Sequence, residues 1–259
     1  MTDKDVKNLI EIEKKLYTYE GEDRVLSSHD MAQALREEDK PILIKSGIPT
    51  LDNYIGGFEG GELTVISGLT GNGKTLFAQT LTQDFDKQGF KSLWFSYEVM
   101  PANFLRAFGE DLPLFYMPSR LIENSLTWIN TRIHEAKLKY EVKAVFVDHL
   151  HFIVTMNRGN VSVEIGAVMR AIKKIALKFN IAFFLIAHTM KCKPDTELGI
   201  GDTRDSSFIE QEADNVFYIW RTKKERQAIL KIAKNRRNGV FDKKITLFKV
   251  GHFLEELSV

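Results

Sequence analysis

The residues of this 259-residue chain that are best suited to chemistry lie between positions 68 and 75. They follow the pattern G-x-x-x-x-G-K-T, which is typical of a phosphate-binding loop between a strand and a helix. In such a loop, backbone N–H groups surround phosphate oxygens, the lysine reaches the β- and γ-phosphates, and the threonine hydroxyl holds Mg²⁺. The loop consists of Gly68, Leu69, Thr70, Gly71, Asn72, Gly73, Lys74 and Thr75. We therefore expect a site for a nucleotide and Mg²⁺ rather than a glycine-rich turn with a chance lysine.

Three further polar side chains, Asp148, Glu98 and His188, each stand at the end of an apolar run. A carboxylate in the position of Asp148 is suited to complete the Mg²⁺ site. Glu98 could polarise the water that attacks a phosphate, or it could be a capping or salt-bridging residue. His188 could sense the γ-phosphate, although a lone histidine can equally be satisfied by nearby backbone.

A basic segment covers residues 221–249, with eleven Lys and Arg against two acidic residues, while the whole chain has a net charge of +1. In a nucleotide-binding protein such a segment suggests phosphate partners, either nucleotide or nucleic acid; the alternative is a solvated basic face. Within it, Lys234 and Arg236 precede a turn and could act as an arginine finger on the ATP of a neighbouring subunit. By themselves they are also compatible with an ordinary basic hairpin.

The elements that must position these residues alternate between apolar runs and helical patterns. The apolar runs are residues 63–67, 92–97, 144–147, 182–187 and 216–220. Continuous apolar strands separated by helices indicate a parallel sheet covered on both sides. The helix over 165–179 is the clearest, with apolar residues at helical spacing. After residue 220 the alternating segments 228–234, 244–250 and 253–259 predict antiparallel strands added at the sheet edge.

The remaining sequence sets limits on the class of protein. Residues 1–45 contain two helical patterns and predict an extension that is a linker, an arm on a neighbouring subunit or a cover for its own domain. Cys192 is the one cysteine, which fits a reducing cytosol and excludes an intrachain disulfide. There is neither an apolar signal region nor a run long enough to span a bilayer, so we expect no membrane partner. A cytoplasmic location is favoured, in the host if the protein is phage-encoded, and a mitochondrial one is left open.

Taken together, residues 46–259 resemble the RecA-type motor of DnaB-like replicative helicases, which include phage primase-helicases and the mitochondrial helicase Twinkle. The entry to the motor matches at residues 46–52, and residues 95–100 resemble the family element F-S-L-E-M. Residues 202–214 are similar to the family stretch D-L-R-E-S-G-x-I-E-Q-D-A-D. A histidine at position 188 and the spacing K-x-R-x-x-G at residues 234–239 are similar to the phage and mitochondrial branch.

The resemblance implies a role for each matching residue. Glu98 maps to the catalytic glutamate, and Asp148 to the aspartate of the Mg²⁺ site. Arg236, with Lys234 beside it, maps to the finger that acts in trans. In the family, the loop equivalent to residues 202–214 lines a central channel and contacts the DNA backbone. The implied DNA-contacting positions are Lys191, Arg204, Asp205 and Ser207, where Asp205 and Ser207 replace the more usual Glu and Gly.

The implied fold is an α/β, RecA-like P-loop NTPase whose mostly parallel twisted sheet is flanked by helices. The implied function is that of an ATP-dependent helicase, with ATP and Mg²⁺ as cofactors and with a 5′-to-3′ polarity that is a property of the family alone. The implied partners are single-stranded DNA, further copies of the chain in a hexameric ring, and a primase or helicase loader. In this family a primase or collar domain helps to hold the ring, and here only residues 1–45 are available for that purpose.

Two other functions use the same motor core. One is a RecA- or KaiC-like ATPase that is not a helicase, such as a recombination mediator or a signalling ATPase. The other is an assembly module that uses ATP binding to recruit replication partners. The loop at 202–214 and the cation pair Lys234/Arg236 favour the helicase.

Overall fold

The computed structural model describes residues 3–21, 23–37, 40–154, 161–188 and 206–257. The chain divides into two compact units, Met1–Pro41 and Ile42–Val259. The first contains helices α1 (Asp3–Tyr17) and α2 (Ser28–Glu37). Apolar side chains of α1, including Leu9, Ile10 and Leu16, are exposed. In the part of the chain that the structure describes, no helix has the length and apolar character needed to cross a bilayer.

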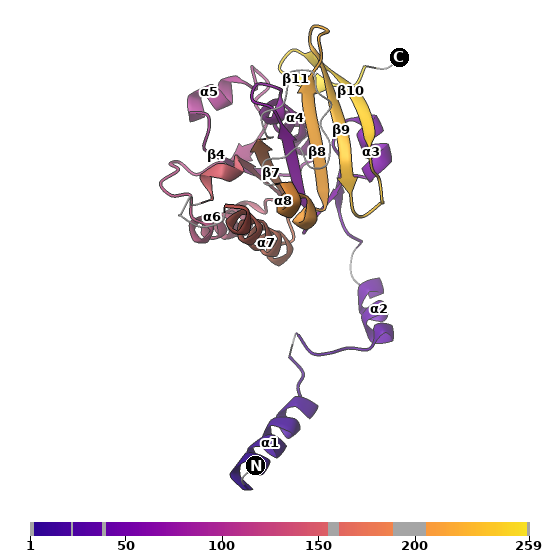
Figure 1. Ribbon diagram of the computed structural model, residues 1–259, viewed down its shortest axis with the longest axis vertical. Helices are drawn as coiled ribbons and strands as arrows, with labels where there is room; N and C mark the ends of the chain where they lie inside the picture. The colour runs from indigo at the N-terminus through magenta and orange to yellow at the C-terminus, as the bar shows by residue number, and fades with distance from the viewer. Residues whose placement is uncertain (1–2, 22, 38–39, 155–160, 189–205, 258–259) are drawn as a thin grey trace. The chain divides into compact units, whose positions relative to one another are not determined.

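The second unit is built on a nine-stranded sheet with the order β11-β10-β9-β8-β3-β7-β6-β4-β5 (Figure 1). Its strands are β3 (Leu63–Gly68), β4 (Ser92–Ser96), β5 (Phe115–Tyr116), β6 (Ala144–Asp148), β7 (Ala182–His188), β8 (Asn215–Arg221), β9 (Gln227–Asn235), β10 (Lys243–Val250) and β11 (Phe253–Glu255). Strands β8, β3, β7, β6, β4 and β5 pair in parallel, whereas β8 to β11 pair antiparallel. A separate small sheet pairs β1 (Leu43–Ile44) with β2 (Phe58–Glu59). The predicted fold class is therefore confirmed, with its antiparallel strands at the C-terminal edge.

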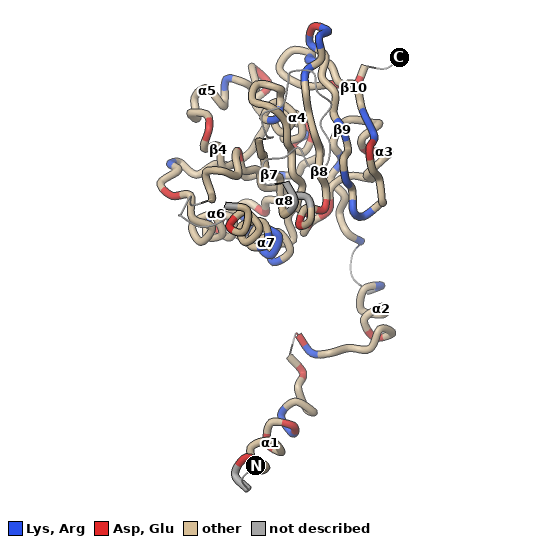
Figure 2. The backbone as a smooth tube through the Cα atoms, in the orientation of Figure 1, with Lys and Arg blue, Asp and Glu red and all other residues tan. Residues whose placement is uncertain are grey.

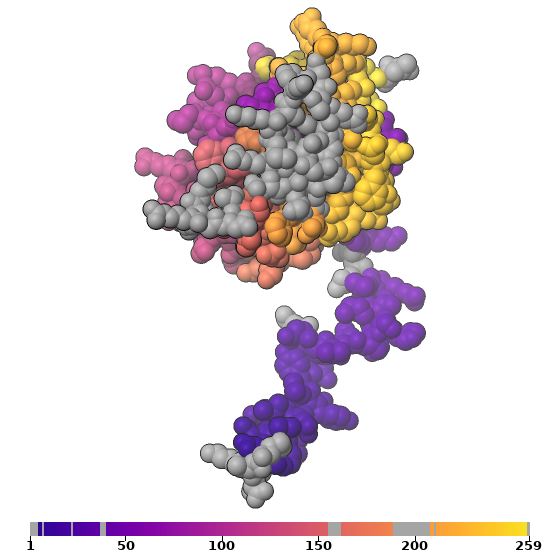
Figure 3. Space-filling model, in the orientation of Figure 1, coloured from indigo at the N-terminus to yellow at the C-terminus, as the bar shows by residue number. Residues whose placement is uncertain are grey.

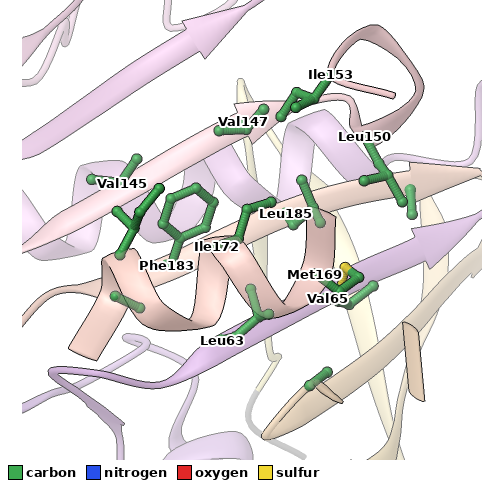
Figure 4. Packing of buried hydrophobic residues seen from close by; sticks show 14 of the residues in the cluster. Leu63, Val65, Val145, Val147, Leu150, Ile153, Met169, Ile172, Phe183 and Leu185 are labelled. Atoms are coloured by element: carbon green, nitrogen blue, oxygen red, sulfur yellow. The ribbon is translucent and has the colours of Figure 1, made fainter. Parts of the chain in front are cut away.

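Helices cover both faces of this sheet. They are α3 (Pro49–Ile55), α4 (Lys74–Lys87), α5 (Pro101–Arg106), α6 (Leu126–Tyr140), α7 (Val161–Phe179) and α8 (Ser206–Glu212), with a short 3₁₀ helix η1 at Leu150–Phe152. Successive strand residues point to opposite faces, so each central strand supplies two cores. Leu63 and Val65 of β3 pack with Met169 and Ile172 of α7 in one core (Figure 4), whereas Ile66 belongs to the other core.

The two-sided burial explains why the central strands have continuous apolar sequences. All five residues of β6 are buried, and so are all six of β3. A strand that is buried on both faces has no solvent side on which polar residues could alternate. Most polar groups are therefore found at the strand ends, where the candidate functional side chains lie.

Candidate functional site

The carboxyl ends of the central parallel strands bring the sequence-predicted nucleotide residues together at one edge of the sheet. Gly68 at the end of β3 pairs with His188 at the end of β7. Asp148 at the end of β6 pairs with Ile186 of β7 and with Ser96 of β4, two residues before Glu98. In parallel sheets, ligands bind outside the carboxyl ends of the strands. We call this edge, with its loop at 68–75, the phosphate edge.

The loop between β3 and α4 has the backbone that its glycines permit. Gly73 has a φ of 98°, in the left-handed region that favours glycine, and it stands immediately before the first turn of α4. At Gly68, a Cβ atom would lie 2.3 Å from the backbone oxygen of Ile219 on β8, so no larger residue fits there. The glycines thus allow the loop to turn sharply into the N-terminus of α4, where free N–H groups can face an anion.

Lys74 is buried beneath this loop. Its Nζ donates hydrogen bonds to the backbone oxygens of Gly68, at 2.9 Å, and Leu69, at 3.0 Å. Burial lowers the pKa of Lys74, and this effect exceeds the opposing influence of Asp148 and Glu98. Two backbone carbonyl groups, which carry only partial negative charge, therefore hold the ammonium group. A phosphate bound in the loop would offer it a full negative charge instead.

Thr75 and Asp148 lie side by side although they are far apart in sequence. The Thr75 hydroxyl donates a hydrogen bond of 2.7 Å to Oδ2 of Asp148. Asp148 is fully buried, and its Oδ1 has no hydrogen-bond partner among the described residues. Burial raises the pKa of Asp148 to about 6, despite the hydrogen bond from Thr75. A hydroxyl beside an unpaired carboxylate oxygen is an all-oxygen donor set that suits Mg²⁺.

Glu98 and His188 face each other across the same edge, and His149 joins them. Oε2 of Glu98 lies 3.4 Å from Nδ1 of His149 and 3.9 Å from Nε2 of His188. The other ring nitrogen of His188, Nδ1, lies 3.5 Å from the hydroxyl of Thr70 in the loop. Burial lowers the pKa of His149 to about 4 and also lowers the pKa of His188. Both imidazoles are therefore neutral at pH 7.

Two adjoining hollows open at this edge. One, of about 220 Å³, is lined by Thr70, Gly71, Gly73, Lys74, Thr75, Leu76, Glu98, His188 and Arg221. The other, of about 420 Å³, is lined by Asn72, Gly73, Leu76, residues 221–228, Lys249 and Leu254. Because Gly73, Leu76 and Arg221 line both, the two hollows are neighbours at the start of α4.

Sequence reasoning missed two residues of this edge. His149 directly follows Asp148, so its place beside a strand end was available as a signal. Arg221 ends β8, the neighbour of the loop strand β3, and its backbone N–H donates a 3.2 Å hydrogen bond to Oδ1 of Asn72. This second placement depends on the pairing of β8 with β3, which no local pattern reveals.

The sequence-predicted finger residues lie at the other end of the sheet, which we call the opposite edge. Asn235, just before Arg236, pairs with Asn215 at the start of β8, whereas the phosphate-binding loop lies beyond the end of β8. A strand of this length spans about 20 Å. Arg236 is half exposed; it bonds to Asp214 at 3.2 Å and to the backbone oxygen of Gln211 at 2.7 Å. Lys234 donates to the backbone oxygen of Ala213 at 2.8 Å.

Other charges at the opposite edge are paired within the chain. Asp214 also accepts bonds from Lys173, at 2.5 Å, and from the backbone of Leu63, at 2.8 Å. Arg237 bonds to Glu62 at 2.9 Å and to the backbone oxygens of Ile55 and Gly57. Arg237 therefore fastens the start of β3 to the loop after α3.

The basic segment does not form a single patch. Figure 2 shows basic residues at the turn between β8 and β9, beside the phosphate edge, and others farther along β9 and β10. In the space-filling view the C-terminal strands form one continuous side of the second unit (yellow in Figure 3). Lys231 at the middle of β9 is nearly buried and pairs with Asp242 at 2.6 Å. The prediction that the basic segment binds phosphates therefore applies separately to the cations at the turn between β8 and β9 and to those along β9 and β10.

The predicted DNA-contacting residues Lys191, Arg204 and Asp205 lie outside the described residues. Ser207 is in the first turn of α8, but its side chain is not among those described. The described part of α8 packs on α7: Ile209 is fully buried, and Glu212 lies 3.5 Å from Arg170. The role of the four residues in binding DNA stays a prediction.

Comparison with known proteins gives one family and one fold. The family model described as DnaB-like helicase C terminal domain matches residues 44–107 and 112–253. The chain is 26% identical over 254 residues to the replicative DNA helicase DnaB of Rickettsia typhi, covering 81% of this chain and 51% of the relative. It is 28% identical over 223 residues to the corresponding protein of Mycoplasma pneumoniae, covering 70% and 47%. The chain thus spans about half the length of the curated relatives it matches.

Solved structures agree in fold. A structure of a DnaB-like replicative helicase and its interactions with primase superimposes with a TM-score of 0.77 at 17% identity, covering 98% of this chain and 72% of that chain. A second solved structure, described as an ATPase domain, superimposes with a TM-score of 0.76 at 16% identity, covering 89% and 97%.

Proposed function

Because the chain belongs to the family of DnaB-like helicase C-terminal domains, we propose that it is an ATP-driven motor that translocates on single-stranded DNA and separates duplex DNA. The observation that carries this proposal is the phosphate edge. Lys74, the Thr75–Asp148 pair and Glu98 meet around one hollow, although they come from three different strand ends. Nucleotide hydrolysis needs a cation for the phosphates, oxygen ligands for a metal and a base for water, and these residues supply all three.

ATP with Mg²⁺ would supply the phosphoanhydride bond whose hydrolysis drives motion. Lys74 would exchange its two carbonyl partners for phosphate oxygens, and Thr75 with Asp148 would hold the metal. Glu98 orients the attacking water and accepts its proton. His188 lies between Glu98 and Thr70, so it can move with either of them when the γ-phosphate is lost. The base and ribose would occupy the larger hollow beside Arg221.

The finger residues support action between subunits. Arg236 and the loop of the same chain lie at opposite ends of β8, about 20 Å apart, beyond the reach of one side chain. Arg236 can therefore stabilise a phosphate only on another copy. An interface that joins two different edges of the same chain is heterologous, and such interfaces form a ring when the rotation between subunits closes and a filament when it does not. We infer a ring, with six subunits by analogy with the family resemblance.

The DNA-contacting residues would be Lys191, Arg204, Asp205 and Ser207, of which Lys191 and Arg204 are cations. Contacts of this kind follow phosphates and do not read sequence. Helix α8 begins directly after Asp205 and leads to Asp214, which binds Arg236. One short segment, α8 with Asp214, thus links the proposed DNA-contacting residues to Arg236, which would act on the neighbour's nucleotide. A primase is a further candidate partner, since a structurally similar helicase has been solved with its primase interactions.

The proposed motor is tested by strand displacement on forked duplexes with ATP and Mg²⁺, using Lys74→Ala as the control. The proposal expects unwinding that needs a 5′ single-stranded tail and is lost in the variant. ATP hydrolysis that ignores DNA and separates no strands would instead favour a non-helicase ATPase. Partner binding with negligible turnover would favour an assembly module.

Action in trans is tested by mixing two inactive variants, Lys74→Ala and Arg236→Ala. In a randomly mixed ring, about a quarter of the interfaces join an intact loop to an intact finger. Hydrolysis should then recover in the mixture, although each variant alone is inactive. No recovery in rings shown to contain both variants would contradict the assignment of Arg236.

A further inference from the structure

Glu98, His149 and His188 form a compact group of metal-ligating side chains at the phosphate edge. Each offers one donor atom, and the three donor atoms lie within 4.8 Å of one another. The Glu98 oxygen is 3.4 Å from Nδ1 of His149 and 3.9 Å from Nε2 of His188. Ligands bound tetrahedrally at about 2.0–2.1 Å are separated from each other by roughly 3.3 Å. Small side-chain rotations would bring these three atoms to that spacing.

We propose that Glu98, His149 and His188 bind a divalent transition metal ion such as Zn²⁺ when no nucleotide is present. Zinc sites are known in which two imidazoles and one carboxylate bind the ion and a fourth position is open to water. This donor set differs from the all-oxygen pair Thr75–Asp148, because Mg²⁺ prefers oxygen ligands and imidazole suits Zn²⁺, Cu²⁺ and Ni²⁺. The phosphate edge therefore contains two neighbouring cation sites of different chemistry.

Two observations independent of the spacing support this site. Nδ1 of His149 is buried and makes no hydrogen bond within the described residues, so a ligand-competent nitrogen is left available. Nδ1 of His188 lies beside the Thr70 hydroxyl, which orients Nε2 toward Glu98. An outer hydrogen bond that fixes the ring is common for histidines that bind metals.

The site would regulate hydrolysis, and this consequence rests on the proposed function. A Glu98 carboxylate that is bound to a metal ion cannot accept a proton from water. Glu98 and His188 also line the hollow of about 220 Å³ that Lys74 and Thr75 share. Zn²⁺ that binds before ATP enters would therefore inhibit ATP hydrolysis even with Mg²⁺ in excess, and a chelator selective for Zn²⁺ would restore it.

Binding is measured on the full chain without nucleotide, by titration with Co²⁺ followed by visible absorption and by calorimetry with Zn²⁺. The expected result is one ion per chain, a Co²⁺ spectrum typical of four-coordination, and displacement of Co²⁺ by Zn²⁺. His149→Asn should weaken binding at least about tenfold. His252→Asn is the matched control, because this exposed histidine lies at the turn between β10 and β11 and should leave the affinity unchanged.

A second variant, His188→Gln, keeps the test decisive if His149→Asn does not fold, since it should also weaken binding at least about tenfold. Absence of one-to-one binding, or equal affinity in wild type and either folded variant, would overturn the proposal. Because these measurements need no nucleotide, they are independent of whether the chain unwinds DNA. For regulation, the ratio of hydrolysis rates with and without Zn²⁺ is compared in wild type and His149→Asn, and equal ratios would exclude an inhibitory role.

Discussion

The two ends of the central sheet both contain charged groups but treat them differently. At the opposite edge, Asp214 is bound by Lys173, Arg236 and backbone, and Glu62 is bound by Arg237. At the phosphate edge, Asp148 keeps a buried oxygen and His149 a buried nitrogen that have no hydrogen-bond partner among the described residues. Buried polar groups that lack partners are costly, and at the phosphate edge a bound ligand would satisfy them. The named charges of the opposite edge are thus paired within the chain, whereas Asp148 and His149 at the phosphate edge each keep an atom that can bind a ligand.

The largest expected effect comes from substituting Lys74. The comparison of the two edges predicts that this substitution greatly reduces ATP hydrolysis without lowering stability. Lys74→Ala should reduce ATP hydrolysis by about 100-fold or more, because the phosphates lose their cation. Without nucleotide the variant should unfold at a temperature equal to or above that of the wild type, since a buried ammonium group is removed. Nucleotide binding by calorimetry and unfolding by circular dichroism measure the two effects. A strongly destabilised variant would mean that Lys74 is a structural residue.

Asp148→Asn should separate stability from activity most clearly. A pKa raised to about 6 means that the carboxyl group contributes stability below its unfolded pKa and loses it as the pH rises through 6. At pH 7 the buried charge therefore costs up to about 3 kcal/mol, taking about 1.36 kcal/mol per pKa unit. The nucleotide-free variant should be more stable at pH 7 and similar to wild type near pH 3, while Mg²⁺-dependent hydrolysis is lost. Denaturant unfolding at both pH values checks this.

Arg236 and Arg237 are adjacent, and they allow a residue proposed to act on ATP to be compared with one that stabilises the fold. Arg237 is one-quarter exposed and joins Glu62 to two backbone carbonyls, so Arg237→Ala should lower the free energy of unfolding by about 2–3 kcal/mol. Arg236→Ala should cost less than about 1 kcal/mol, because Asp214 retains Lys173. Hydrolysis should show the reverse order, once Arg237→Ala is assayed well below its melting temperature. Equal losses of stability in Arg236→Ala and Arg237→Ala would contradict the assignment of a structural role to Arg237 alone.

The smallest effect is on the pH dependence of stability. The pKa of His149 is lowered to about 4, so its contribution to stability is complete above pH 6.5 and is lost as the pH falls through 4. His149→Asn should flatten this fall by about 1–2 kcal/mol, allowing for water entering the hollow. The comparison is made in the Asp148→Asn background, because Asp148 has the opposite pH dependence over the same range. An unchanged slope would show that His149 has the same pKa in the folded and unfolded chain.

The sequence by itself determined the fold class and most of the phosphate edge. Continuous apolar runs separated by helical patterns require strands that are buried on both faces, and such strands leave polar residues only at their ends. Since the carboxyl ends of parallel strands meet at one edge, the pattern alone brings the loop at 68–75 together with the distant residues Glu98, Asp148 and His188. The antiparallel strands at the C-terminal edge followed from alternation and turn residues.

Only the tertiary structure decided which polar groups have partners. Strand pairing placed Arg221 beside the loop and brought His149 to Glu98. It also left Arg236 half exposed, whereas the adjacent Arg237 is mostly buried and paired with Glu62. Burial and pairing depend on contacts between residues that are distant in sequence, such as Arg237 with Glu62, so no local pattern specifies them. Those contacts determine whether a charge stabilises the fold or is left for a ligand.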